Sequence, residues 1–317
     1  NGPRLGNKVI EAKHVAKAYG DKLLFDDLNF MLPPNGIVGV IGPNGAGKST
    51  TMKMMLGLVK PTDGAVRILG KTMNEKNRLT VLSMIGSLIE SPAYYGHLSG
   101  RENLEIAATL KGVNKKSVSH ALEIVHLNDV GNKKVKHYSL GMKQRLGIAC
   151  ALLGNPKLIL LDEPTNGLDP AGIQEIRQLI CRLPKQYGMT VLVSSHLLSE
   201  IDQMAAEIGI IDHGELLFEN SLHVLHAHSQ ESLHLRTSEP KRALALLKEK
   251  HVPASLSTSG PDRRDTILSL PMLSDSELSG VLHALITDHI EVFRIEESKK
   301  SLEDIFLDLT GRSVCLS

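Results

Sequence analysis

The sequence predicts an α/β protein: a phosphate-loop nucleotide-binding domain built on a mixed sheet, followed by a small α+β domain. Three observations support this fold class. A glycine-rich loop at 42–50 lies between a predicted strand and a predicted helix, strands alternate with helices in the second half of the chain, and the composition changes after about residue 220. We expect a nucleotide-binding domain over 8–220, with a helical part at about 92–154, and an accessory domain over 221–317.

The first predicted elements are antiparallel strands. Residues 8–32 alternate roughly between apolar and polar side chains, with Gly20-Asp21 between the two halves, which is typical of a strand pair with one face in solvent. The apolar run Ile37–Ile41 predicts the strand that enters the glycine-rich loop. A helix is expected after that loop, over Met52–Leu58. The early strands would form an antiparallel part beside the main sheet.

The glycine-rich loop fits the phosphate-loop pattern G-x-x-x-x-G-K-[ST], because it reads Gly42-Pro43-Asn44-Gly45-Ala46-Gly47-Lys48-Ser49-Thr50. A strand that turns through glycines into a helix aims backbone N–H groups and the positive end of the helix dipole at one point. We therefore expect a nucleotide and Mg²⁺ here, with Lys48 reaching the β- and γ-phosphates and Ser49 ligating the metal. The other predicted nucleotide contacts of the loop are Asn44, Gly45, Gly47 and Thr50. The alternative is an ordinary glycine-rich turn.

The middle of the chain is predicted to be helical. Apolar side chains recur at helical spacing over 102–110, over 118–127 and again from about Met142. Gly154-Asn155-Pro156 is a strong stop signal for the third helix. These three helices make up the expected helical part of the nucleotide-binding domain.

A second site signal lies at the end of a buried strand. Lys157–Asp162 is nearly continuously apolar, which is typical of a parallel strand buried on both faces. Such a strand delivers Asp162 and Glu163 to the edge of the sheet where α/β proteins bind ligands. We expect Asp162 to hold Mg²⁺ and Glu163 to orient or deprotonate the water that attacks the γ-phosphate. The alternative is a pair of solvated acids.

The chain after about residue 220 is predicted to form a linker and a separate small domain. His223, His226 and His228 lie in polar surroundings that favour a solvated linker over a metal site. Residues 231–296 then show strand, helix, strand, strand, helix and strand patterns in that order. This βαββαβ order suggests a ferredoxin-like unit, and it contains no catalytic constellation.

Composition excludes several classes of partner. The formal net charge is +1, aromatic residues make up 3% and tryptophan is absent, so we expect no nucleic-acid partner. The three cysteines form no C-x-x-C pair, which argues against a disulfide framework and a zinc site. No run reaches the roughly 18–20 apolar residues that span a bilayer. Any action at a membrane would therefore depend on a partner.

Five motifs, in this order, resemble the nucleotide-binding subunit of an ABC transporter, over roughly 8–220. They are GPNGAGKST at 42–50, Tyr138-Ser139-Leu140-Gly141-Met142-Lys143-Gln144-Arg145, LILLDEP at 158–164, Asn166-Gly167-Leu168-Asp169 and Ser195-His196. The resemblance implies a dimer in which two copies enclose two ATP molecules. It also implies membrane-spanning permease subunits on separate chains, with this chain at the cytoplasmic face of the membrane.

The resemblance also assigns roles to single residues. It implies that Ser139 and Gly141 contact the γ-phosphate held by the other copy, and that Asp169 crosses the dimer interface. It makes His196 the switch histidine at the γ-phosphate and Tyr19 the aromatic that stacks on adenine. Without the resemblance, a lone histidine or tyrosine in these places would be read as structural.

Two departures from the family pattern narrow the choice of branch within the ABC transporter family. The usual Leu-Ser-Gly-Gly-Gln appears here as Tyr-Ser-Leu-Gly-Met, so Leu140 and Met142 depart from the pattern. Glu90 stands where the family commonly has Gln, at a position that touches Mg²⁺ or the attacking water and links the site to the membrane subunit. The alternative for Glu90 is an ordinary surface acid.

These departures, together with Asn-Gly-Leu-Asp-Pro, resemble the bacitracin and lantibiotic exporter branch, and 301–311 resembles the ending of antibiotic-exporting ATPases. The resemblance implies an ATP-hydrolysing subunit that gives protection against an antimicrobial peptide. The nearest alternative is an exporter of another drug, a lipid or a polysaccharide. A soluble ABC ATPase without a transport role is a more distant one, because that class normally carries two cassettes in one chain.

Overall fold

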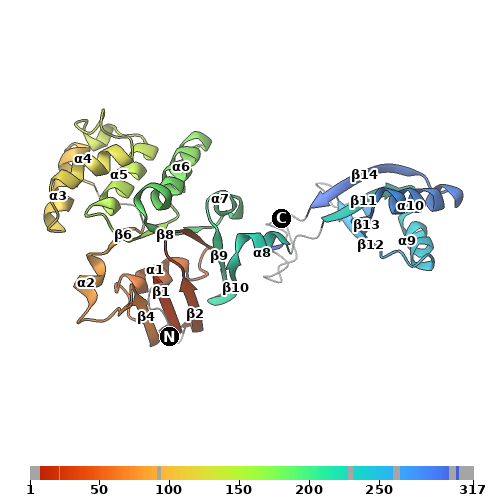
Figure 1. Ribbon diagram of the computed structural model, residues 1–317, viewed down its shortest axis with the longest axis horizontal. Helices are drawn as coiled ribbons and strands as arrows, with labels where there is room; N and C mark the ends of the chain where they lie inside the picture. The colour runs from red at the N-terminus through yellow and green to blue at the C-terminus, as the bar shows by residue number, and fades with distance from the viewer. Residues whose placement is uncertain are drawn as a thin grey trace, which may run out of the picture. The chain divides into compact units, whose positions relative to one another are not determined.

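The protein forms two compact units, which meet at His223 and Val224 in the chain (Figure 1). The computed structural model describes residues 8–20, 22–90, 94–227, 231–259, 265–299 and 305–306. Most of the antibiotic-exporter-like ending at 301–311 therefore lies outside the described residues. The two units are described separately below.

A mixed six-stranded sheet lies at the centre of the first unit, in the order β10-β9-β3-β8-β7-β6. Its strands are β3 (Ile37–Ile41), β6 (Ile85–Leu88), β7 (Leu158–Asp162), β8 (Thr190–Ser195), β9 (Glu207–Asp212) and β10 (Glu215–Ser221). All neighbours pair in parallel except β10, which runs antiparallel to β9. Every residue of β7 and β8 is buried, which explains the nearly continuous apolar sequence of β7.

A second, antiparallel sheet has the order β2-β1-β4-β5. Its strands are β1 (Ile10–Tyr19), β2 (Lys22–Leu32), β4 (Asp63–Ile68) and β5 (Lys71–Thr72). Ile10 and Phe25 from this sheet share one buried cluster with Met52 of the first helix and Leu158 of the central sheet. That helix is α1 (Lys48–Met55), which starts inside the glycine-rich loop, four residues earlier than the apolar pattern predicts.

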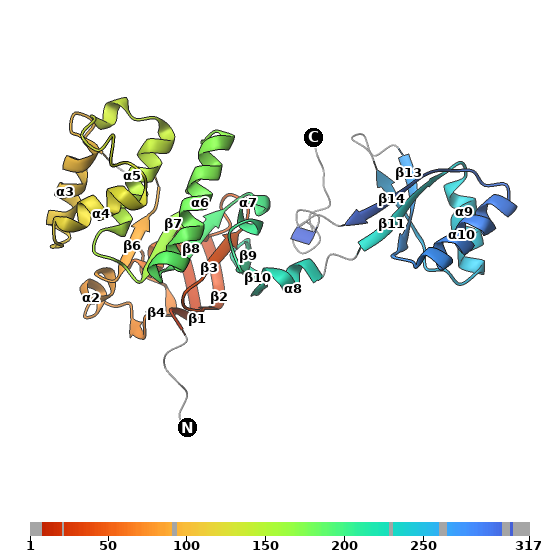
Figure 2. The ribbon, with the colours of Figure 1, turned by 45° about the horizontal axis from the view of Figure 1, so that its top comes forward.

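Three helices form the helical part of the first unit and gather at one end of it (Figure 2). They are α3 (Gly100–Leu110), α4 (Lys116–Ile124) and α5 (Leu140–Leu152). Ser99 starts α3 with a capping box, because its hydroxyl accepts from the Glu102 N–H while the Glu102 carboxylate accepts from the Ser99 N–H. The remaining elements of the first unit are α2 (Arg78–Leu82), a 3₁₀ turn at Val135–His137, α6 (Pro170–Tyr187) and α7 (Leu198–Asp202).

The prediction of a solvated linker after residue 220 is wrong for the first part of that segment. Residues Leu222–Ala227 form a helix, α8. Leu222 and Leu225, three residues apart, are both buried, so one face of this segment is apolar despite its histidines. The polar residues in and around this segment obscured the three-residue spacing of its two leucines in the sequence. No group of three or more His, Cys, Asp or Glu side chains that could hold a metal ion occurs among the described residues, and His228 lies outside them.

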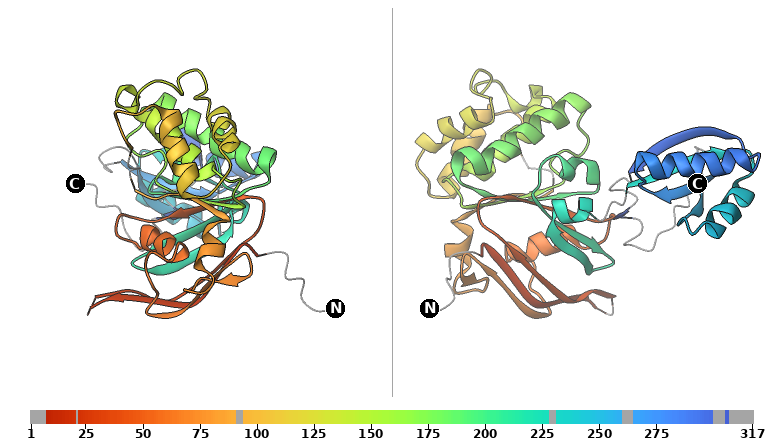
Figure 3. Two further views of the ribbon diagram at one scale, coloured as in Figure 1. Left: turned by 90° about the vertical axis from the view of Figure 1, so that its left-hand side faces the viewer. Right: turned by 45° about the vertical axis from the view of Figure 1, so that its right-hand side comes forward.

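The second unit contains a four-stranded antiparallel sheet with the order β12-β13-β11-β14. Along the chain its elements are β11 (Glu231–Thr237), α9 (Pro240–Glu249), β12 (Ser255–Ser259), β13 (Asp265–Pro271), α10 (Asp275–Thr287) and β14 (Val292–Lys299). Leu235 and Leu268 of the sheet pack with Leu247 and Leu285, so both helices cover one face (Figure 3). The predicted fold class is confirmed.

None of the helices in the described part of the chain is both long enough and apolar enough to cross a bilayer.

The separate core of the second unit leads to a stability prediction. Leu235→Ala removes a side chain that is 0% exposed, and we expect it to lower the free energy of unfolding of this unit by about 2–5 kcal/mol. Hydrogen exchange should then become faster in β11, β13, α9 and α10. Ile286→Ala is the control, because that side chain is 63% exposed and its loss should cost little. Equal acceleration in β7 and β8 would show that the two cores are not separate.

Candidate active site

The glycine-rich loop joins β3 to α1 and is built around two glycines with left-handed backbone. Gly45 has φ +86° and Gly47 has φ +107°. A Cβ atom at Gly47 would lie 2.4 Å from Cε1 of Phe25, so only glycine fits there. The Ala46 N–H donates to the Pro43 carbonyl at 3.1 Å, and the Thr51 hydroxyl donates to the Gly47 carbonyl at 3.0 Å. These hydrogen bonds help to hold the loop in shape.

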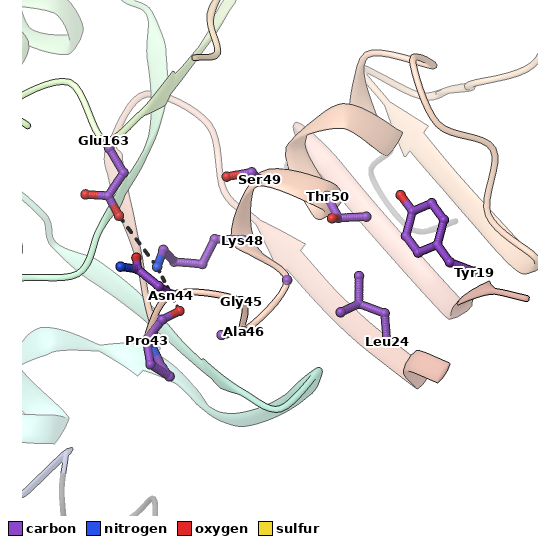
Figure 4. Close-up of a pocket in the computed structure, with 11 residues that line it drawn as sticks. Tyr19, Leu24, Pro43, Asn44, Gly45, Ala46, Lys48, Ser49, Thr50 and Glu163 are labelled. Carbon is purple, nitrogen blue, oxygen red and sulfur yellow. Dashed lines mark hydrogen bonds and ion pairs between the residues drawn. The ribbon is translucent and has the colours of Figure 1, made fainter. Parts of the chain in front are cut away.

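A cavity of about 380 Å³ opens over this loop (Figure 4). Its volume is within the range of small-molecule sites. Tyr19 lies beyond one end of the loop and Glu163 beyond the other. The cavity is lined by Tyr19, Leu24, Pro43, Asn44, Gly45, Ala46, Gly47, Lys48, Ser49, Thr50 and Glu163. All loop residues predicted to bind nucleotide are thus on its wall.

The ammonium group of Lys48 is buried and lies among polar partners. Its side chain is 6% exposed, and Nζ donates to the carbonyls of Gly42 at 2.5 Å and Pro43 at 3.2 Å. Nζ also lies 3.5 Å from Oε1 of Glu163. A buried ammonium needs such partners. The loop therefore holds its positive charge at the wall of the cavity.

Asp162 and Glu163 sit where β7 ends beside β8. Asp162 is 8% exposed and accepts a hydrogen bond from the Ser194 hydroxyl at 2.5 Å. The same hydroxyl accepts from the Glu163 N–H at 2.9 Å. Glu163 has φ +47°, a left-handed conformation that is uncommon for a non-glycine residue. The strand therefore ends in a sharp turn that Ser194 stabilises.

This turn places the Glu163 carboxylate between two basic side chains. Oε1 lies 3.5 Å from Lys48 Nζ, and Oε2 lies 2.6 Å from Nδ1 of His196. His196 follows β8 directly and is half exposed, with 40% of its side chain accessible. The structure therefore brings together the three residues that the sequence predicts at the reacting phosphate.

Glu90 lies at the same edge of the sheet, although the sequence did not reveal the strand that leads to it. β6 pairs in parallel with β7, with Leu88 opposite Leu161, so their carboxyl ends lie side by side. Glu90 has φ +62°, and its Oε1 lies 2.6 Å from Nζ of Lys53. The hydrogen bond with Lys53 lowers the pKa of Glu90.

The predicted metal ligands offer the right kind of donor. The hydroxyl of Ser49 and the carboxylates of Asp162 and Glu90 are hard oxygen donors, which suit Mg²⁺. Ser49 lines the cavity at the start of α1. Both carboxylates act on the same side chain, because the hydrogen bond with Glu90 and, to a smaller extent, the charge of Asp162 raise the pKa of Lys53. The donor set therefore fits a magnesium ion bound with a nucleotide.

Tyr19 presents an open ring to the cavity. Its side chain is 51% exposed, and Nζ of Lys17 lies 4.6 Å from the ring centroid. The ring is therefore not part of the core, as a purely structural tyrosine would be. An exposed aromatic face next to a cation suits stacking against a base.

Three predicted site residues lie away from this cavity, each at the beginning of a helix. The Ser139 hydroxyl caps α5 by accepting from the Met142 N–H at 3.2 Å, and Gly141 lies in the first turn of that helix. The Asp169 carboxylate caps α6 by accepting from the Gly172 N–H at 3.0 Å. None of the three lines the cavity. One copy of the chain does not bring them to its own phosphate loop.

The sequence analysis missed a buried carboxylate behind the site. Glu200 on α7 is 8% exposed, and its Oε2 accepts from the hydroxyls of Thr165 at 2.7 Å and Ser195 at 2.9 Å. Thr165 lies two residues after Glu163, and Ser195 directly precedes His196. Glu200 therefore ties together the two turns that carry these side chains. Its spacing from Ser195 is the only local signal, since Thr165 is 35 residues away in the chain.

A phosphate loop after one strand, an acid pair after a second and a histidine after a third define an ATP-binding P-loop enzyme. The profile of the ABC transporter family matches residues 25–166. The bacitracin transport ATP-binding protein BcrA of Bacillus licheniformis is 42% identical over 96% of this chain and 97% of its own length. The chain belongs to the ABC transporter family of ATP-binding proteins and is an ATPase.

Two further comparisons cover a smaller share of the chain. The lantibiotic transport ATP-binding protein SrtF of Streptococcus pyogenes is 42% identical over 67% of this chain and 90% of its own length. The solved structure of the ATP-binding cassette MJ0796, a dimer in a post-hydrolysis state bound to ADP and Pi, has a TM-score of 0.60 at 28% identity. It covers 67% of this chain and 98% of that one. Each match spans about two thirds of this chain, whereas the match with BcrA spans nearly all of it.

The contacts of Glu200 lead to a kinetic prediction. Glu200→Ala leaves the hydroxyls of Thr165 and Ser195 without their acceptor, so the turns that carry Glu163 and His196 should shift. We expect kcat to fall about 10- to 100-fold, because small displacements of catalytic groups have effects of this size. ATP affinity, measured by equilibrium binding, should change far less. Glu200→Gln keeps an acceptor oxygen and should retain more activity.

A suitable control is Glu277→Ala, which removes a carboxylate that accepts from the Ser274 hydroxyl at 2.6 Å in the second unit. It should leave kcat within about twofold of the unmodified chain, as expected for a substitution away from the site. Full kcat in Glu200→Ala would contradict the positioning role.

Proposed function

We propose that two copies of this chain bind and hydrolyse ATP between them and power the removal or export of a bacitracin-like or lantibiotic peptide. The observation that carries the proposal is the match to BcrA over both units, at 96% of the chain. The name of that relative describes bacitracin transport. The match to SrtF supports the same class of cargo but reaches only 67% of the chain. Bacitracin-like peptides are therefore the first cargo to test.

The geometry of the site supports in-line attack of water on the γ-phosphate. The Glu163 carboxylate would orient the water and accept its proton. Lys48 would stabilise the charge of the transferred phosphoryl group, and His196 would contact the γ-phosphate beside Glu163. Tyr19 would stack on the adenine, and the N–H groups of Gly45, Gly47 and their neighbours would bind the phosphates.

Magnesium is the proposed metal cofactor. Ser49, Asp162 and Glu90 would hold it, directly or through water. When bound, the metal neutralises the negative charge that develops on the phosphate oxygens during the reaction.

The second half of each site would come from another copy of the chain. Ser139 is exposed and its hydroxyl can still donate a hydrogen bond, since its contact with Met142 uses it only as an acceptor. The first turn of α5, with Gly141, adds free N–H groups and the positive end of a helix dipole. Asp169, at the start of α6, would cross the interface. The dimeric solved relative supports this arrangement.

The membrane part of the transporter would be supplied by separate chains. The relatives are named as ATP-binding proteins of transport systems. We propose that permease subunits bind this chain at the cytoplasmic face of the membrane and that Glu90 lies on the route by which they sense ATP.

Replacing the proposed base separates binding from hydrolysis. Glu163→Gln keeps the shape of the side chain but removes its ability to accept a proton, so kcat should fall by about 10²- to 10⁴-fold. ATP affinity should persist, and the variant should accumulate as an ATP-bound dimer in size-exclusion chromatography. Glu75→Gln changes an exposed carboxylate elsewhere on the unit and serves as the control. Unchanged turnover in Glu163→Gln would falsify the assigned base.

Resistance measurements test the cargo. The chain expressed with its candidate permease subunits should raise the inhibitory concentration of bacitracin or a lantibiotic, because ATP hydrolysis would drive removal of the peptide. The same cells carrying Glu163→Gln should remain sensitive. Transport of another drug, a lipid or a polysaccharide with no change in peptide resistance would reject the cargo while leaving the ATPase intact.

A further inference from the structure

Lys53 is a cation that neither the phosphate loop nor the motifs of the site account for. It lies in the last turn of α1, four residues after Ser49. Side chains four residues apart lie on the same face of a helix, and side chains lean toward the helix N-terminus. The ammonium of Lys53 is therefore carried by the same helix face as the hydroxyl of Ser49.

The charges around Lys53 are those of the proposed metal ligands. Its Nζ lies 2.6 Å from Oε1 of Glu90. The side chains are 32% and 69% exposed, so both can move without breaking a packed core. The carboxylate of Asp162 also acts on Lys53 through space. The Lys53 ammonium thus lies close to Glu90 and one helical turn from Ser49. It also interacts electrostatically with Asp162.

Glu90 creates an electrostatic problem that Lys53 solves. A carboxylate at this edge of the sheet adds negative charge where the phosphates of ATP must bind. The ammonium in contact with Glu90 neutralises that charge. Exposed ion pairs of this kind are weak, so the contact can be exchanged for a stronger one at little cost.

We propose that Lys53 is a positioning residue that competes with the divalent cation for the Glu90 carboxylate. Without the metal, Lys53 holds and neutralises Glu90, and it releases Glu90 when a metal–nucleotide complex enters. This inference rests on the proposed metal site. It adds that Lys53 acts as an exchangeable counter-ion within this site.

The proposal gives one substitution two effects of opposite sign. Lys53→Met removes the competing ammonium, so less divalent cation should be needed for half-saturation, by about two- to fivefold. The same change leaves Glu90 unneutralised, so binding of the nucleotide without metal should weaken by a similar factor. A general loss of structure would weaken both. Lys53→Arg keeps the charge and should behave like the unmodified chain.

The measurement is binding rather than turnover. Mn²⁺ is titrated into the full chain with a non-hydrolysable ATP analogue and followed by electron paramagnetic resonance, and metal-free analogue binding is measured separately by calorimetry. Glu90→Gln should abolish both effects of Lys53→Met in the double variant, because the competition acts through Glu90. Lys60→Met is the matched control, since Lys60 lies 2.6 Å from Glu75 in another exposed ion pair. That control should shift neither quantity.

Three results would overturn the inference. The first is no shift in Lys53→Met. The second is the same shift in the Glu90→Gln background, which would mean that Lys53 acts on the site without Glu90. Both would leave the proposed metal site standing. The third is analogue binding by the unmodified chain that does not depend on Mn²⁺, which would reject the proposed metal site and this inference with it.

Discussion

The parallel pairing of the central strands is the constraint on which the site depends. In a parallel sheet the carboxyl ends of neighbouring strands share one edge, and the residues that follow them meet there. Ile41 pairs with Ser195 and Asp162 with Ser194, so the phosphate loop, the acid pair and His196 all start from that edge. A slip of one residue in any pair would turn the strand's side chains to the opposite face. Strand register is therefore the first determinant of catalysis in this chain.

The charged side chains at this edge are held by contacts that also connect the turns. Glu163 lies between Lys48 and His196. Glu200 accepts hydrogen bonds from the hydroxyl of Thr165, two residues after Glu163, and from that of Ser195, directly before His196. Buried charges are costly without partners, so each of these contacts serves both stability and orientation. Catalytic geometry here is a consequence of satisfying buried polar groups. The carboxylate of Glu90 is 69% exposed, so its pair with Lys53 can be exchanged at little cost.

The two units differ in what they contribute. The first carries the nucleotide cavity. The second has its own apolar core, and the match with SrtF covers only 67% of the chain. ATP chemistry thus belongs to the first unit. The starts of α5 and α6 also lie outside the cavity, which is why a complete site is proposed to need a second copy.

The sequence by itself determined the phosphate loop, the acid pair after β7 and the α/β class, because these depend on local backbone preferences and on the period of apolar residues. It did not reveal the contact of Glu200 with Thr165 or that of Glu90 with Lys53, whose residues lie 35 and 37 positions apart in the chain. It also concealed α8, where two leucines outweigh a polar composition. Such contacts were decided only by the tertiary structure, because strand order and register choose which distant side chains meet.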